Sequence, residues 1–501
     1  MSTERRPTDT HDRSTRRAFL RHAVTGLGGL TLASLLDANG FFSATAQAPL
    51  GMAPPPAPAT AKVKSVIYLF MFGGPSQMDL FDYKPALQRA DGTSVEHEWR
   101  RGQMRVSQAL GSRRNFQQHG ETGQWCSDAL PGLAAHMDKL AVLKSLYTDS
   151  FAHGSAVLQM NTGQTLQGHP AMGSWVTHGL GSRNPDLPPF VVMHDPRGGP
   201  ISGPTNWSSG YMPADLQGTL FRATGDPLLD LSPDVGALNE RRITRAIQRR
   251  QIEAIRELNA IHESTRSGVS ELAARSASYD LAYRLQQTAP DALDLEQEDA
   301  RTRALYQVDA PPGEHRLSVG AGVFGRQCLI ARRLVERGVR FVQIYHGGGH
   351  QQQTWDAHNG VEENLSIHCP EIDGPVSGLL TDLEQRGLLD ETLVLWGGEF
   401  GRQPVSQLNG AGQTRSEGGR DHNPRALTMW MAGGGVRPGS YGETDELGFE
   451  AVVNRHHLRD LHATVLHLLG IDHRELTYLH GGLERKLTGV VEAHPIQGVL
   501  A

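Results

Sequence analysis

The chain has 501 residues, of which 38% are hydrophobic and 20% charged. This composition can bury a substantial core and excludes a globally disordered protein. The net charge of -6 argues against a nucleic-acid-binding protein that works by phosphate neutralisation. The three cysteines, Cys126, Cys328 and Cys369, are too few for a disulfide framework. They predict either one bridge or three small buried residues.

The N-terminus has the pattern of a twin-arginine signal peptide. Arg16-Arg17 precedes Phe-Leu and an apolar stretch over about 23–36, which is too short and too rich in glycine to span a bilayer. Small-x-small cleavage patterns follow within 44–48. A basic amphipathic helix is the alternative. We therefore expect residues 1–48 to be a signal peptide, the protein to fold before export to the periplasm or another extracytoplasmic site, and the mature chain to lack a transmembrane anchor.

The rest of the chain alternates apolar runs with amphipathic patterns. Residues 49–61 read as a proline-rich linker, and 64–72 as a strand buried on both faces. Further strands are expected at 190–193, 340–345, 392–396 and 427–431, and helices at 323–336, 376–385 and 458–469. This alternation predicts an α/β domain over 62–501, with a mostly parallel sheet flanked by helices. The segment 235–308, rich in Arg, Glu, Gln and Ala, is expected to be a helical insertion.

Polar side chains that can bind metals lie at several strand ends, where sites gather in parallel sheets. Carboxylates mixed with imidazoles suit zinc, manganese or iron, whereas all-oxygen sites suit magnesium or calcium. One such residue pair is also typical of a surface loop, but several at successive strand ends favour a metal. Asp460 precedes an apolar run and is better explained as a helix N-cap. The candidates are Asp356 and His358, Glu399 and Arg402, and Asp421 and His422.

These loops resemble the exported family known as domain of unknown function 1501, which is similar to the alkaline phosphatase/sulfatase superfamily. The resemblance covers nearly all of the chain beyond the linker, and it implies that superfamily's α/β fold. It also implies a divalent metal (zinc, manganese, calcium or magnesium) held by Asp79, Asp356, His358, Glu399, Asp421 and His422. The motifs are Phe72-Gly-Gly-Pro-Ser76 with Asp79, Trp355-Asp-Ala-His358, Gly398-Glu-Phe-Gly-Arg402, Gly419-Arg-Asp-His422 and Asp460-Leu-His-Ala-Thr464.

The resemblance implies His153 and Arg402 as catalytic residues. The stretch from His153 to Thr162-Gly163 has the spacing of the superfamily's nucleophile helix, with histidine in place of serine, threonine or the cysteine that becomes formylglycine. We expect His153 to be a metal ligand or base rather than a covalent nucleophile. Arg402 or Arg420 would neutralise an anionic substrate. The alternative for His153 is a first-turn histidine bonded to a neighbouring loop.

Two functions follow from the resemblance. One is an exported, metal-dependent hydrolase of phosphate or sulfate esters, acting on an anionic small molecule or a sulfated or phosphorylated glycan. The other is a non-catalytic metal- or ligand-binding protein that keeps the fold and partners another exported protein. A mutase or transferase on the same fold is a third reading.

Overall fold

A computed structural model describes residues 61–100, 102–222, 245–265, 284–285, 289–349, 351–407 and 418–501. All of them belong to the second of two compact units, Gly51–Ala501. The expected signal peptide, 1–48, and the linker up to residue 60 lie outside the described residues. Among the helices that are described, none is both long and apolar enough to cross a membrane.

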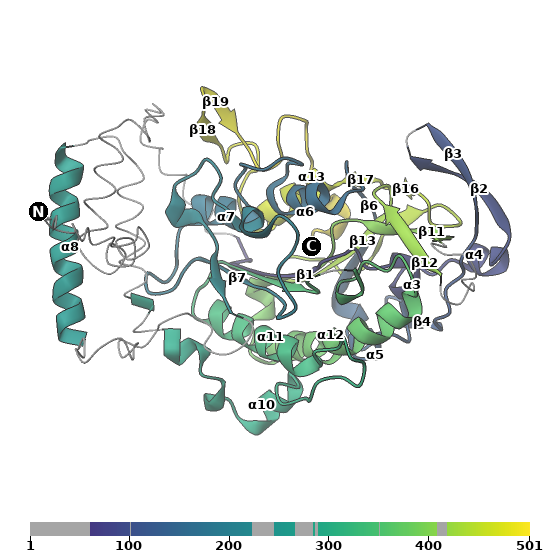
Figure 1. The fold of residues 1–501 in the computed structure, drawn as a ribbon, viewed down its shortest axis with the longest axis horizontal. Helices are drawn as coiled ribbons and strands as arrows, with labels where there is room; N and C mark the ends of the chain where they lie inside the picture. The colour runs from purple at the N-terminus through teal and green to yellow at the C-terminus, as the bar shows by residue number, and fades with distance from the viewer. Residues whose placement is uncertain are drawn as a thin grey trace, which may run out of the picture. The chain divides into compact units, whose positions relative to one another are not determined.

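A nine-stranded sheet forms the centre of this unit (Figure 1). Its order is β14-β6-β13-β10-β1-β9-β7-β8, with β17 also paired to β6. Within this sheet, as far as the structure describes it, β13 runs antiparallel to both neighbours, and the other pairings are parallel. The expected α/β fold with a mostly parallel sheet is therefore confirmed. The strands are β1 (Ser65–Met71), β6 (Leu140–Tyr147), β7 (Phe190–Met193), β8 (Thr219–Phe221), β9 (Phe341–His346), β10 (Thr392–Gly397), β13 (Leu427–Gly433), β14 (Gly439–Tyr441) and β17 (His456–His457).

Helices cover both faces of the sheet, and β1 shows why. Its residues are buried throughout and alternate between two apolar clusters, as the period of two in a strand requires. Ile67 packs on the face covered by α11 (Ala321–Glu336) and α12 (Val361–Gln385). Tyr68 packs on the opposite face. That face is covered by α6 (His153–Thr162), α7 (Met172–Leu180) and α13 (Leu458–Leu468).

The start of α12 and the N-cap of α13 differ from their predictions. Helix α12 begins at Val361 rather than at 376, and both Pro370 and Pro375 lie inside it. An interior proline usually ends or kinks a helix, yet this helix continues through both prolines. In α13 the N-cap is His457, and Asp460 is the third helical residue of a capping box. The N-cap interpretation of Asp460 was therefore wrong by one helical turn.

The expected insertion over 235–308 is described in part. Helix α8 (Arg245–Thr265), the short helix η4 (Leu295–Gln297) and α10 (Ala300–Leu305) fall within it. Ala289 and Ala292 are fully buried in the cluster beneath α11 and α12. The C-terminal part of this segment therefore belongs to the α/β core.

The three cysteines are free and buried. Burial raises the pKa of each thiol, that of Cys126 to about 12. They act as small apolar core residues, which confirms the second of the two interpretations.

Candidate metal centre

Four metal-capable side chains converge at the carboxyl edge of the parallel strands. His153 begins α6, just after β6, and Asp356 and His358 follow β9. His422 lies on β12 (Gly419–Asn423), ahead of β13. Because β13 is antiparallel, its start lies at the edge where the other strands end. One ligand atom from each of these residues lies within 4.8 Å of the others. We call them the histidine–aspartate group.

Each histidine of the group has its Nδ1 occupied by an acceptor outside the group. The acceptors are a carboxylate, a main-chain carbonyl and an amide oxygen, and an imidazole can only donate to such atoms. The three Nδ1 atoms therefore carry protons. His153 donates to Glu399 Oε1 at 2.6 Å, His422 to the Phe151 carbonyl at 2.7 Å and His358 to Gln407 Oε1 at 2.6 Å.

The other ring nitrogens all face the carboxylate of Asp356. Nε2 lies 3.2 Å from Asp356 Oδ2 in His153, and 3.0 and 3.1 Å from Oδ1 in His358 and His422. In a neutral ring each of these Nε2 atoms carries a lone pair. A hydrogen-bond acceptor on the ring therefore faces a carboxylate oxygen that is also an acceptor. The buried His153 Nε2 makes no well-aligned hydrogen bond. Positive charge is needed between these atoms, and a divalent cation fits that need.

The electrostatics of the group agree with this need for positive charge. Burial alone would lower the pKa of His153, but hydrogen bonds to Asp356 and Glu399 outweigh it and raise that pKa to about 9. Burial lowers the pKa of His422 to about 4, helped by the charges of Arg402 and His153. Burial would raise the pKa of Asp356, yet Arg402 and the three histidines hold it well below its usual range. Without a metal, a proton on His153 supplies the missing charge.

Glu399 stands behind His153 rather than within the group. Its side chain is fully buried, and both carboxylate oxygens accept from the Gly73 amide at 3.1 Å. Gly73 has a φ of +114°, and a Cβ there would lie 2.5 Å from the Asp356 amide nitrogen. The glycine turn after β1 thus lets three separate loops meet. A carboxylate that orients a ligating histidine is a common feature of metal sites.

Arg402, on β11 (Gly401–Gln407), lies beneath the group and is fully buried. It donates to Asp356 Oδ1 at 2.7 Å, to the Gly74 carbonyl at 2.8 Å and to the Arg420 carbonyl at 3.0 Å. A further bond goes to the Gly73 carbonyl. The N–H donors of Arg402 are bonded to protein acceptors. Arg402 therefore holds Asp356 in place and does not face a ligand.

The two remaining predicted ligands are not members of the group. Asp79, on α3 (Gln77–Leu80), is fully buried and accepts from Arg420 at 2.8 and 3.2 Å. Asp421 lies at the rim, where Oδ1 is 3.9 Å from His358 Nδ1 and Oδ2 accepts from the Trp99 indole at 2.9 Å. Its side chain is 26% exposed, so the site opens to solvent beside it.

Sequence reasoning did not find the anchors at Gln407 and Phe151. Gln407 belongs to no motif, because its part depends on the hairpin that β11 forms with β12. The Phe151 anchor is a main-chain carbonyl, which any residue supplies. Neither had a signal that a pattern search could detect.

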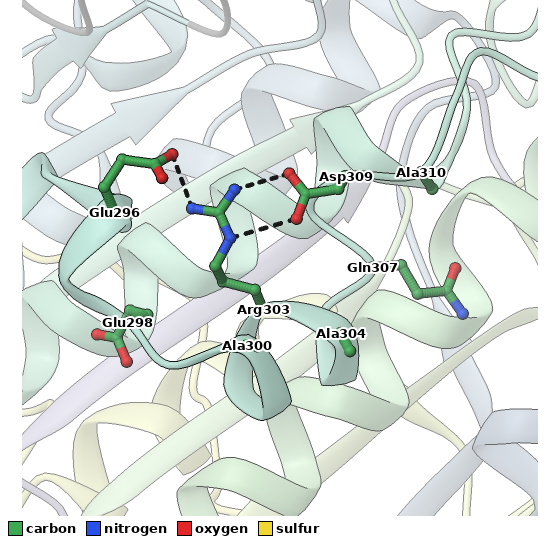
Figure 2. Close-up of a pocket in the computed structure, with 8 residues that line it drawn as sticks. All are labelled: Glu296, Glu298, Ala300, Arg303, Ala304, Gln307, Asp309 and Ala310. Carbon is green, nitrogen blue, oxygen red and sulfur yellow. Dashed lines mark hydrogen bonds and ion pairs between the residues drawn. The ribbon is translucent and has the colours of Figure 1, made fainter.

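A surface depression near α10 is a different feature (Figure 2). In it, Arg303 points between Glu296 and Asp309 and pairs with them at 2.8 and 2.7 Å. Arg303, the one cation among the described residues that line the depression, is therefore neutralised by the protein. The depression contains no member of the histidine–aspartate group. The residues that line it are Glu296, Glu298, Ala300, Arg303, Ala304, Gln307, Asp309 and Ala310.

The family profile described as "Protein of unknown function (DUF1501)" matches residues 63–500. No curated protein matches the sequence significantly. Among solved structures, the lipoteichoic acid synthase LtaP from Listeria monocytogenes has 9% identity over 88% of this chain and 77% of its own, with a TM-score of 0.34. A protein in the alkaline phosphatase superfamily from Vibrio parahaemolyticus has 10% identity over 84% and 70%, with a TM-score of 0.36. A sulfatase from Pseudoalteromonas sp. has 12% identity over 82% and 68%, with a TM-score of 0.33. Similarity at this level carries no activity over to this chain.

Proposed function

The chain belongs to the DUF1501 family, as its motifs predicted, and we propose that it is an exported, metal-dependent hydrolase of phosphate or sulfate esters. One observation carries the metal centre: three histidines anchored through Nδ1 turn Nε2 toward a single carboxylate. The ester chemistry rests on the resemblance of the motifs to the alkaline phosphatase/sulfatase superfamily. The substrate would be an anionic small molecule or a sulfated or phosphorylated glycan.

The histidine–aspartate group would hold the cation. Three imidazoles and one carboxylate favour zinc or manganese over calcium or magnesium, which prefer oxygen ligands. A bound cation would polarise the ester oxygens and supply the positive charge that an anionic substrate needs. The buried Arg402 and Arg420 do not supply this charge to a substrate, because both are bonded to protein acceptors.

The surrounding residues prepare the group for this role. Glu399 holds His153 in the tautomer with its lone pair on Nε2, and Gln407 does the same for His358. Arg402 fixes the carboxylate of Asp356. Asp421 is ionised at neutral pH, since the Trp99 indole and the His422 amide hold its pKa down against burial. Being partly exposed, it adds a negative charge at the rim of the site.

Any sulfate-ester chemistry here would not use formylglycine. His153 occupies the position that the resemblance gives to the nucleophile. Cys126, Cys328 and Cys369 are all buried outside α6. We therefore place His153 among the metal ligands rather than in a covalent step.

A non-catalytic metal-binding protein, partner of another exported protein, is the second candidate. It is favoured by the histidine, rather than a hydroxyl or thiol residue, that stands at the position the resemblance gives to the nucleophile. The burial of both Arg402 and Arg420 points the same way. Turnover separates the two candidates, since both require a metal.

The test compares the wild-type protein, purified after native export, with His153→Ala. We expect stoichiometric zinc or manganese and turnover on a phosphate- and sulfate-ester panel in the wild type, and loss of both in the variant. His178→Ala is the control, since His178 is half-buried and contacts the Thr477 carbonyl outside the group. Loss of activity with metal retained would make His153 a base or nucleophile. A metal-loaded wild type without turnover would favour the second candidate, and a wild type without metal affinity would contradict both.

A further inference from the structure

A buried hydrogen-bonded chain leads from helix α12 to the loop that carries Asp356. Trp355 is the neighbour of Asp356 and is only 1% exposed. Its indole Nε1 donates to His346 Nδ1 at 3.1 Å. His346 is the last residue of β9, so the indole ties the loop to the end of a core strand.

The Trp355 indole determines the tautomer of His346. An indole nitrogen only donates, so Nδ1 of His346 must accept, and the proton of the neutral ring lies on Nε2. That Nε2 is 3.0 Å from Glu371 Oε2, in a short contact that is not well aligned. Glu371 is held in turn by Arg197 at 2.9 Å and by the Val319 amide at 2.7 Å. Its negative charge favours the Nε2–H tautomer.

The same residues could be taken for a second metal site. His346, His368 and Glu371 each offer a ligand atom within 4.8 Å of the others. The hydrogen bonds argue against it, because His346 Nε2 carries a proton and Nδ1 is occupied by the indole. Glu371 is also already bonded to Arg197, Ser318 and Val319. This cluster therefore differs from the histidine–aspartate group, in which Nε2 of each histidine faces a single carboxylate.

We propose that the chain Glu371–His346–Trp355 is a positioning device for the metal ligand Asp356, an inference that rests on the proposed metal centre. The main chain at Trp355 is held by its amide, which donates to the Phe72 carbonyl at 2.9 Å, and by its carbonyl, which accepts from the Ala357 amide at 3.0 Å and from Arg402 at 3.4 Å. The indole bond adds a side-chain anchor to these main-chain contacts, and together they fix the direction in which Asp356 leaves the loop. Arg402 then sets the rotation of that carboxylate. Glu371 is thus a positioning residue that acts through two others.

The test is Trp355→Phe, which keeps an aromatic ring and removes the indole donor. We expect the protein to fold and its zinc affinity, measured by chelator competition, to fall by about 10-fold, the lower end for a lost outer partner of a metal site. Trp430→Phe is the matched control. Trp430 is equally buried, and its Nε1 has no hydrogen-bond partner among the described residues. It should keep wild-type affinity despite a similar loss of packing.

Equal affinities in the two variants would overturn the positioning role while leaving the metal centre intact. A wild type with affinity for neither zinc nor manganese would overturn both. If Trp355→Phe fails to fold, a second measurement tests the same inference. In metal-free wild-type protein with ¹⁵N-labelled histidine, His346, assigned by its loss in His346→Asn, should show its proton on Nε2. A proton on Nδ1 would contradict the inference.

Discussion

Gly73 shows how closely three loops approach one another at the edge of the sheet. Its φ of +114° is a conformation that L side chains rarely adopt. An added Cβ would lie 2.5 Å from the Asp356 amide nitrogen and 2.7 Å from that of Trp355. Both contacts are with backbone atoms, so the clash cannot be relieved by rotating a side chain.

We therefore expect Gly73→Ala to lower the free energy of unfolding by more than the roughly 1–2 kcal/mol that a left-handed non-glycine residue costs. Urea unfolding of the metal-free protein measures this. Gly387→Ala is the control, because Gly387 has a φ of +68° with open space around its Cβ position. If the two variants lose equal stability, the close approach at Gly73 is not a strong restraint.

At the scale of elements, the buried pair of Asp79 and Arg420 joins α3 to β12. Neither side chain is exposed, so removing one charge leaves the other buried and unpaired. Burial alone would raise the pKa of Asp79, but the charge and hydrogen bonds of Arg420 hold it below its ordinary value. The pair therefore stabilises the fold above the unfolded-state pKa of about 3.9.

We predict that Asp79→Asn costs about 3–5 kcal/mol at pH 7, the range for breaking a buried pair. The difference from wild type should shrink as the pH falls below about 4 and through the lower folded pKa, because the wild-type carboxylate is then protonated too. Unfolding curves at several pH values measure this. Asp472→Asn removes the partner of the exposed Arg474 and should change stability little. A pH-independent loss in Asp79→Asn would contradict the ion-pair account.

The main strands were predictable because they are buried on both faces and read as apolar runs. The strand β6 was missed, since Lys144 and Ser145 interrupt its pattern. The residue types of the site were also predictable from the strand ends. Their partners were not, because the contacts of Asp79 and Arg402 depend on how a third segment approaches in space. The sequence does not distinguish a carboxylate that will contact a metal from one that will contact an arginine.

At the scale of the whole molecule, export remains a prediction from the N-terminus. Arg16-Arg17 and the apolar stretch after it predict transport of the folded protein. We expect replacement of both arginines by lysine to leave the precursor in the cytoplasm, while the wild type is cleaved near residue 49. Immunoblots of cell fractions measure this. A matched replacement of Arg5-Arg6 should leave export unchanged, and normal export of the first variant would contradict the assignment.

The anchor of His422 has a consequence for how this family can vary. Its acceptor is the main-chain carbonyl of Phe151, which any residue at position 151 can supply as long as the turn before α6 keeps its shape. Gln407 differs, because its side-chain oxygen holds His358. Across related chains, positions 358 and 407 should therefore change together, while position 151 drifts independently of 422.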